Sequence, residues 1–265
     1  MRIENQKTLP RSKTRRFLLK IKNRAKNKGI RSVVADGVNR IRRMVNNWLR
    51  FSFWYYYNRT FKWWKTFVFQ QNKYRYFYHK YNTTWRNERT VEIPIVHRML
   101  QETTGEVLEV GNVLSHYFGI KHNVVDKYER AEGVITHDVT EIQTSKRYDL
   151  IISISTLEHV GWDENPDNRE LVNDPEKILL ALGKLRELLK PKGKIVVTVP
   201  LGYNPHLDRL LRSGKLRFDK QYFMKRASKG DSWFETDWEK VKNAKFNRRV
   251  PTGNAIVIGF IENQS

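Results

Sequence analysis

The feature that most constrains the fold of this chain is a short apolar run that ends at a glycine, within residues 105–115 (GEVLEVGNVLS). Val107–Val110 has the length and character of a fully buried parallel strand, and Gly111 follows where such a strand turns sharply into the next element. Glu109 lies beside that turn. A carboxylate at the carboxyl end of a strand in an open α/β sheet faces the crevice where ligands bind. A solvated, purely structural glutamate is the alternative interpretation.

Further apolar runs follow, and several end at polar residues. They predict strands at 123–126, 134–138, 148–155, 194–199, 221–226 and 254–261. Asp126 ends the first of these runs, 17 residues after Glu109, close to where Rossmann-type folds place a carboxylate on ribose hydroxyls. Asp138 ends the second. A helix is predicted from about Asp174 to Lys190, because proline and glycine follow it.

This series of segments resembles the class I S-adenosylmethionine-dependent methyltransferases. The resemblance covers roughly residues 90–265, and its most specific parts are Leu-Glu-His-Val at 157–160 and Leu-Lys-Pro-Lys-Gly at 189–193. It implies a Rossmann-like, doubly wound α/β sheet of seven strands with the last strand antiparallel. It also implies methyl transfer with S-adenosyl-L-methionine as cofactor.

The chain departs from this family in the loop after the first strand. Members usually carry Gly-x-Gly-x-Gly there, whereas this chain has Val113 and Ser115 at the later glycine positions. Asn112 and Ser115 are therefore expected to replace the lost backbone contacts.

The resemblance, combined with the ends of the predicted strands, implies a cofactor site. Its predicted members are Glu109, Gly111, Asn112, Ser115, Asp126, Asp138 and Ser153. Glu109 and Gly111 are expected near the methionine part of the cofactor. Asp126 is expected on the ribose and Asp138 near the adenine amine.

Two neighbouring segments predict the acceptor side of the site. His159 is the candidate general base, since imidazole titrates near neutral pH and the residue follows a predicted strand. A base is needed only for a poorly acidic acceptor, and a supporting role for His159 is also open. Trp162, in the polar loop between His159 and Asp174, and Tyr203, Asn204 and His206 are expected to bind the substrate. Ordinary turns are the alternative.

A proline constrains the segment before the first strand. Pro94 predicts an extended stretch at Thr90–Ile95 lying against the cofactor crevice. Its polar candidates are Arg86, Glu88, Arg89 and Glu92, and surface ion pairing explains them equally well.

The charge of the chain lies almost entirely in its first third. Residues 1–90 hold 24 Lys or Arg and three acidic residues, whereas residues 91–265 hold 26 and 25. We therefore predict a basic, mostly helical extension at 1–72 and a methyltransferase-like domain at 73–265. The chain has no cysteine, which excludes disulfides and a thiol nucleophile, and the sequence shows no metal-ligand spacing.

The basic extension allows three interpretations. Residues 11–28 have the pattern of a basic amphipathic helix, and 18 aromatic residues lie between Trp48 and Trp85. Docking on an anionic membrane fits this mixture, as does nucleic-acid binding. Packing of the aromatics against the catalytic domain is the third. No secretory signal or membrane-spanning run is visible, so we expect a cytoplasmic protein, peripheral on the membrane in the first interpretation.

The acceptor is the least constrained part of the function. We expect a small polar molecule, such as a sugar or a lipid-linked glycan. An RNA acceptor is the second choice, because the catalytic two thirds are not basic overall. A catalytically inactive scaffold with this fold is the third.

Overall fold

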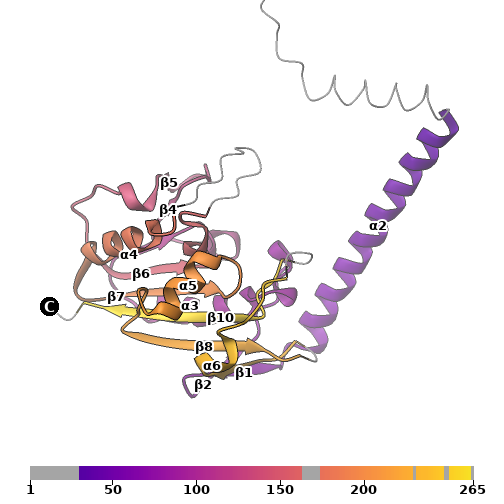
Figure 1. Cartoon of the computed structure of the whole chain (residues 1–265). Helices are drawn as coiled ribbons and strands as arrows, with labels where there is room; N and C mark the ends of the chain where they lie inside the picture. Colours follow the sequence, from indigo (N-terminus) through magenta and orange to yellow (C-terminus); the bar gives the residue numbers. More distant parts are fainter. Residues whose placement is uncertain (1–29, 163–173, 229–230, 248–250, 264–265) are drawn as a thin grey trace, which may run out of the picture. The chain divides into compact units, whose positions relative to one another are not determined.

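The computed structural model describes residues 30–162, 174–228, 231–247 and 251–263 (Figure 1). The helix predicted at 11–28 and most of the polar loop after Trp162 lie outside these described residues. The chain divides into two compact units, residues 1–54 and 55–265. The predicted boundary at residue 72 therefore falls inside the second unit.

Helix α2 (Ile30–Phe61) crosses from the first unit into the second. Every residue from 34 to 51 is exposed, whereas Tyr55 and Asn58 are buried within the second unit. Among the described helices, none combines the length and the apolar character that crossing a bilayer requires.

The second unit is built on a sheet whose eight described strands have the order β5-β4-β3-β6-β7-β10-β8-β9. The strands are β3 (Val107–Val110), β4 (Asn123–Asp126), β5 (Val134–Thr136), β6 (Tyr148–Ile154), β7 (Leu189–Pro200), β8 (Lys220–Arg226), β9 (Trp233–Thr236) and β10 (Ala255–Glu262). Strands β3 to β7 run parallel, and β10 is antiparallel to both β7 and β8. The predicted doubly wound sheet with an antiparallel last strand is confirmed. Strand β9 is an additional edge strand that the sequence did not predict.

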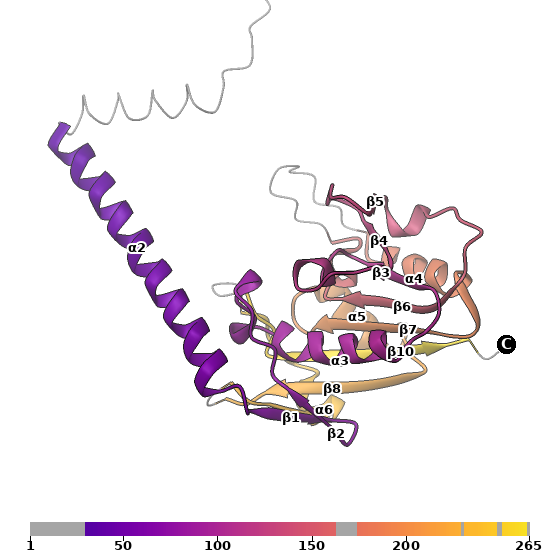
Figure 2. The ribbon, with the colours of Figure 1, turned by 180° about the vertical axis from the view of Figure 1, so that it is seen from behind.

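Apolar layers cover both faces of this sheet. Helices α4 (Lys177–Glu187), α5 (Pro205–Ser213) and the short α6 (Trp238–Val241) belong to one layer, in which Ile151 and Leu185 are buried (Figure 1). Helix α3 (Arg89–Glu102) lies along the other face, where Ile93 and Ile152 are fully buried (Figure 2). Such near-continuous apolar strands are expected of a parallel sheet covered on both sides.

The extended stretch predicted at Thr90–Ile95 is wrong, because these residues belong to helix α3. Proline removes one helical hydrogen bond, the one its missing N–H would have donated to Thr90. The carbonyl of Thr90 instead accepts a hydrogen bond from the backbone N–H of Phe77 at 3.0 Å. This partner, together with the burial of Ile93 and Ile95, stabilises the helix through Pro94.

The hairpin of β1 (Thr66–Phe69) and β2 (Asn72–Arg75) belongs to the core of the second unit. Phe67 and Phe69 are buried, and the ring of Phe69 lies 5.6 Å from that of Tyr222 on β8. The backbone N–H of Gln70 donates to Glu235 on β9 at 2.9 Å. The predicted boundary at 72 cuts through this hairpin.

The helix predicted to end near Lys190 ends earlier, at Glu187, and β7 already begins at Leu189. Pro191 and Gly193 thus lie in the first part of a strand. Hydrogen bonds with Asn263 hold this part in place, from the N–H of Lys192 at 3.0 Å and to the carbonyl of Gly193 at 2.9 Å.

Candidate active site

A cavity of about 310 Å³ lies at the carboxyl ends of β3, β4 and β6. Crevices at this edge of an open α/β sheet are where such folds bind ligands, and the volume suits a small one. Its lining residues are Val110, Gly111, Val125, Asp126, Lys127, Tyr128, His137, Asp138, Val139, Thr156, His159, Val160, Gly161 and Lys177. Four of the predicted site residues are in this lining: Gly111, Asp126, Asp138 and His159.

Asp126 ends β4 on the cavity wall, and backbone amides fix its carboxylate. One oxygen accepts from the N–H groups of Tyr128 and Glu129, each at 2.8 Å, and the other accepts from Asn112 N at 3.1 Å. The carboxylate can accept further hydrogen bonds, because its two oxygens offer about four lone-pair sites. Asp126 is therefore held rigidly and still able to bind a hydroxyl.

Asp138 caps the short 3-10 turn at 139–141 and carries an ion pair. Its Oδ1 accepts from Thr140 N at 3.0 Å, and its Oδ2 lies 2.7 Å from Lys177 Nζ and 3.3 Å from Lys127 Nζ. Although partial burial acts to raise it, the hydrogen bonds from Lys177 and Thr140 hold the pKa of Asp138 well below its usual value. Asp138 is thus a carboxylate that two lysines already neutralise.

Gly111 is required by the approach of the strand-end loop to β6. Its φ is +86°, and a Cβ at this position would lie 2.1 Å from Thr156 Oγ1. Only glycine fits such a contact in the left-handed region without strain. The backbone of the loop can therefore lie directly on the cavity wall.

Glu109 makes hydrogen bonds to this loop and does not line the cavity. Its fully buried carboxylate accepts from Val113 N at 2.9 Å and Leu114 N at 2.7 Å, and its second oxygen lies 2.7 Å from His122 Nε2. The side chain thus binds backbone amides of the loop that follows β3. These hydrogen bonds hold the loop in place although it lacks the later glycines of the family pattern.

The remaining predicted cofactor residues also lie outside the cavity lining. Asn112 accepts from the hydroxyl of Ser115 and donates to Glu129 Oε1 at 2.8 Å, so both residues stabilise the loop. Ser153 is fully buried within β6, and its hydroxyl has no hydrogen-bond partner among the described residues.

The predicted acceptor residues form two contacting pairs on the rim. Tyr203 Oη lies 3.2 Å from Nδ1 of His159, which lines the cavity. The rings of Trp162 and His206 meet edge to face with centroids 5.0 Å apart. The structure therefore brings residues from after β6 and after β7 together, although of these only His159 lines the cavity.

Asn204 is buried and turns away from the rim. Its Oδ1 accepts from His206 N at 2.8 Å and Leu207 N at 3.2 Å, which caps helix α5. Its Nδ2 donates to the carbonyl of Glu158 at 2.8 Å. The side chain thus fixes α5 against the segment that carries His159.

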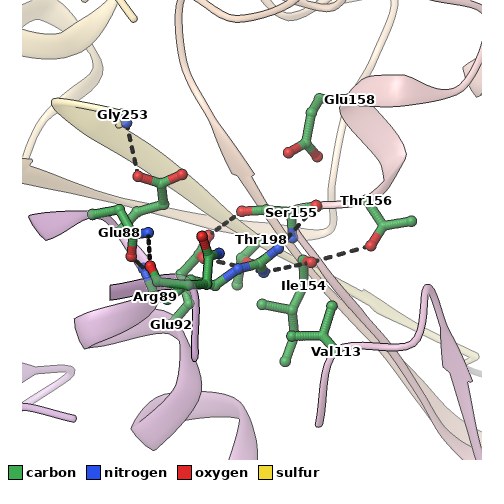
Figure 3. Close-up of polar contacts among 12 residues, drawn as sticks. Glu88, Arg89, Glu92, Val113, Ile154, Ser155, Thr156, Glu158, Thr198 and Gly253 are labelled. Carbon is green, nitrogen blue, oxygen red and sulfur yellow. Dashed lines mark hydrogen bonds and ion pairs between the residues drawn. The ribbon is translucent and has the colours of Figure 1, made fainter. Parts of the chain in front are cut away.

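A buried polar network lies beside the cavity, at the start of α3 and the end of β6 (Figure 3). Arg89 donates to the carbonyl of Ile154 at 2.6 Å and to that of Ser155 at 3.3 Å, and lies 3.5 Å from Glu92 Oε2. Ser155 Oγ donates to Glu92 Oε1 at 2.7 Å. Glu88 accepts from the N–H of Gly253 at 2.7 Å.

Two carboxyls of this network have pKa values above those of exposed glutamates. Burial raises the pKa of Glu92 to about 7, against the opposing effect of the Arg89 guanidinium. Burial also raises the pKa of Glu158 well above its usual value. Perturbed carboxyls beside a cavity are a common mark of functional sites.

The sequence partly indicated this network. Glu88, Arg89 and Glu92 were polar candidates that surface ion pairing explained equally well, and the structure buries Glu88 and Glu92. Glu158 was not predicted, although it lies within the specific Leu-Glu-His-Val segment. Its position four residues after β6 was the available signal.

No family model matches this chain, and no curated protein matches it. Three of the solved structures to which it is similar are methyltransferases. The N-methyltransferase NodS from Bradyrhizobium japonicum, crystallised with S-adenosylhomocysteine, is 12% identical, with 67% of this chain and 88% of that chain covered and a TM-score of 0.40. The 1,6-didemethyltoxoflavin-N1-methyltransferase from Burkholderia thailandensis is 14% identical, with 75% and 98% covered and a TM-score of 0.41. An rRNA methylase from Streptococcus thermophilus is 11% identical, with 65% and 97% covered and a TM-score of 0.37.

At these identities and TM-scores the likeness carries no functional argument. The case for function therefore rests on the cavity, its carboxylates and the sheet topology of the chain itself.

Proposed function

We propose that this chain is an S-adenosylmethionine-dependent methyltransferase with its cofactor in the cavity at the carboxyl ends of β3, β4 and β6. The observation that carries the proposal is Asp126, a rigidly held carboxylate on the cavity wall at the end of the second strand. Gly111 supports it, since the bare backbone at the end of the first strand lies on the same wall.

The lining residues fit the parts of this cofactor. Asp126 would bind the ribose hydroxyls, and Asp138 with its lysine partners would lie near the adenine amine. Gly111 would lie near the methionine part, and Glu109 would act on that part only through the loop that it holds. When bound, the cofactor supplies an activated methyl group on a positively charged sulfur.

The chain's own residues would align the acceptor and manage its proton. Alignment supplies much of the rate of an in-line transfer. His159 lines the cavity and is oriented by the hydroxyl of Tyr203, so it would accept a proton from a weakly acidic acceptor. Trp162 and His206 would form the outer wall of the acceptor site.

For the acceptor we propose a small polar molecule. An RNA acceptor ranks second, because residues 91–265 hold 26 basic and 25 acidic side chains. An RNA-binding catalytic surface is expected to be basic.

Calorimetry with S-adenosylhomocysteine tests the cofactor site. We expect the wild-type chain to bind and Asp126→Ala to lose at least tenfold in affinity. Asp237→Ala removes an exposed carboxylate whose one ion pair within the described residues is with Lys240, and it should leave binding unchanged. Absence of binding by the wild-type chain would contradict the enzyme proposal and favour an inactive scaffold.

We also propose that the chain is cytoplasmic and docks on anionic membranes through α2. Eight exposed apolar residues of α2, all between residues 34 and 51, fall within about 160° of its surface at 100° per residue, whereas the exposed Phe53 and Trp54 lie outside this arc. The eight are Val34, Val38, Ile41, Met44, Val45, Trp48, Leu49 and Phe51. Arg40, Arg42, Arg43 and Arg50 lie outside this arc. A wide apolar arc with a basic opposite face suits the interfacial region of an acidic bilayer, whereas a coiled-coil seam is narrower.

Vesicle co-sedimentation tests this docking. We expect binding to phosphatidylcholine vesicles that contain phosphatidylserine and little binding to phosphatidylcholine alone, with a loss at high salt. Ile41→Glu should abolish it, whereas Asn46→Glu adds the same charge on the opposite face and should weaken it only modestly. Equal loss in both variants would contradict a role for the apolar arc.

A further inference from the structure

The buried network and the cavity share the segment that follows β6. Thr156 and His159 line the cavity, whereas their neighbours Ser155 and Glu158 belong to the network. Ser155 and Glu158 are therefore each next in sequence to a residue of the cavity wall. An acceptor that reaches His159 also approaches Glu158, whose Oε1 lies 3.9 Å from His159 Nε2.

The network holds more carboxyl groups than cationic groups. Glu92 and Glu158 interact electrostatically with the guanidinium of Arg89 and with the third carboxyl, that of Glu88. Arg89 is already committed to two backbone carbonyls and to Glu92. Burying charges without partners is costly, so such a set favours an additional cation or hydrogen-bond donor.

Glu158 has an oxygen that is free to bind this donor. The residue is only 2% exposed, and its Oε2 makes no hydrogen bond within the described residues. By contrast, the carboxyls of Glu88 and Glu92 accept from Gly253 N and Ser155 Oγ. Figure 3 shows the Glu158 carboxyl pointing toward the side of the network that holds Ser155 and Arg89. A buried oxygen without a partner among the described residues is a candidate binding group for a donor on a ligand.

We infer that the methyl acceptor is an amine, and that Glu158 binds its N–H group and accepts its proton. This inference rests on the proposed methyltransferase function and names its substrate class. The ammonium form of the acceptor gives one proton to the Glu158 carboxylate. The freed nitrogen lone pair then forms the new N–C bond, the C–S bond of the donor breaks, and its electron pair stays on sulfur. The positive charge thus passes from sulfur to the methylated nitrogen.

The chemistry of the network disfavours the other acceptor classes. An acceptor carboxylate or phosphate would meet Glu158 and Glu92 and be repelled. A hydroxyl can donate to Glu158 but does not compensate its charge. Burial raises the pKa of Glu158, so its carboxylate is a stronger base than that of an exposed glutamate.

Transfer of label from methyl-labelled S-adenosylmethionine tests the inference on the wild-type chain. One acceptor pool contains phenethylamine, ethanolamine and spermidine, and the matched pool contains phenethyl alcohol, ethylene glycol and phenylacetate. We expect labelled product from the amine pool only, with a rate that rises with pH as the acceptor and Glu158 lose their protons. Product from the second pool alone overturns the inference.

Glu158→Gln isolates the residue. We expect at least a hundredfold loss in kcat/KM for the amine, with an unchanged melting temperature and S-adenosylhomocysteine affinity within twofold of wild type. Glu187→Gln, at an exposed position on α4, should change neither. Full activity of Glu158→Gln overturns the inference. So does S-adenosylhomocysteine binding without label transfer to amines, which leaves the proposed cofactor site standing. Absence of S-adenosylhomocysteine binding overturns both.

Discussion

Gly111 and Thr156 are in such close contact that no side chain on residue 111 would fit between the backbone of Gly111 and the Thr156 side chain. A Cβ on Gly111 would lie 2.1 Å from Thr156 Oγ1 and 2.8 Å from its Cβ. Gly111 follows β3 and Thr156 follows β6, and the two strands are parallel neighbours. The contact therefore sets how closely the strand-end loop approaches the cavity.

Gly111→Ala should consequently impair both stability and cofactor binding. Its φ of +86° is strained for alanine, and the new methyl group must displace Thr156. We expect a loss of about 1–3 kcal/mol in the free energy of unfolding and at least tenfold weaker S-adenosylhomocysteine binding. Urea denaturation and calorimetry measure the two effects.

Gly183→Ala is the matched control for this substitution. Gly183 lies within α4, and a Cβ there meets no atom within 4 Å. Alanine favours a helix interior over glycine, so this variant should be about 0.5–1 kcal/mol more stable. If Gly111→Ala behaved like Gly183→Ala, the close contact with Thr156 would not be important.

The sequence predicted the central strands well because their signal is local. Val107–Val110 and Tyr148–Ile154 are almost entirely buried and read as near-continuous apolar runs, as expected of strands in a covered parallel sheet. The prediction for the segment around Pro94 was wrong for the opposite reason, because the helix there depends on a distant partner. Its stability depends on Phe77, which donates to Thr90 from a segment that no local pattern connects with α3.

The predictions for the candidate site also differ in how far they depend on local sequence. Asp126 and Asp138 were predicted from the ends of their strands, and both line the cavity. Glu109 was assigned to the cofactor from its position, but it is bound by the amides of Val113 and Leu114. Which face of the sheet a strand-end side chain takes is decided by the pleat and the following loop. Glu158 was missed because its burial depends on α3 and on the segment of Asn204.

The β1–β2 hairpin predicts where a stable catalytic fragment begins. Residues 55–265 contain Phe67 and Phe69, which pack in the core, whereas residues 73–265 lack both. Removing two buried aromatic side chains costs several kcal/mol, about 3–5 for each. We expect the fragment 55–265 to unfold cooperatively on heating and the fragment 73–265 to be unfolded or aggregated.

Circular dichroism melting compares the two fragments directly. Cooperative melting of 73–265 near the temperature of the longer fragment would show that the hairpin is dispensable and that the predicted boundary at 72 is correct.

Asn204 is expected to act on stability through two separate contacts. Asn204→Ala removes the cap of α5 and the bond to Glu158, and it should cost about 1–2 kcal/mol. Asn204→Asp keeps a capping oxygen but loses the Nδ2 donor. It should lie between wild type and alanine in urea denaturation. Equal stability of all three chains would contradict both contacts.

Glu92 gives the protein a stability that depends on pH. Its pKa is about 7 in the folded chain, against 4.5 as the ordinary value, so the folded state keeps a proton that the unfolded state has lost. The free energy of unfolding should therefore fall as pH rises from about 4.5 to about 7, by roughly 3 kcal/mol for this group. Below 4.5 both states are protonated, and above 7 both are ionised, so the contribution is flat there.

Glu92→Gln should remove most of this fall, because the amide does not titrate. The groups that face Glu92 are Arg89 and Glu88 from α3, Ser155 after β6 and Thr198 on β7. Glu158 has a raised pKa as well and contributes with the same sign, so a smaller slope should remain in the variant. Urea denaturation at pH 5 and pH 8 measures the difference, with Glu187→Gln as the exposed control. A slope in Glu92→Gln as steep as that of wild type would show that Glu92 ionises normally, and the buried network would then need another source of compensation.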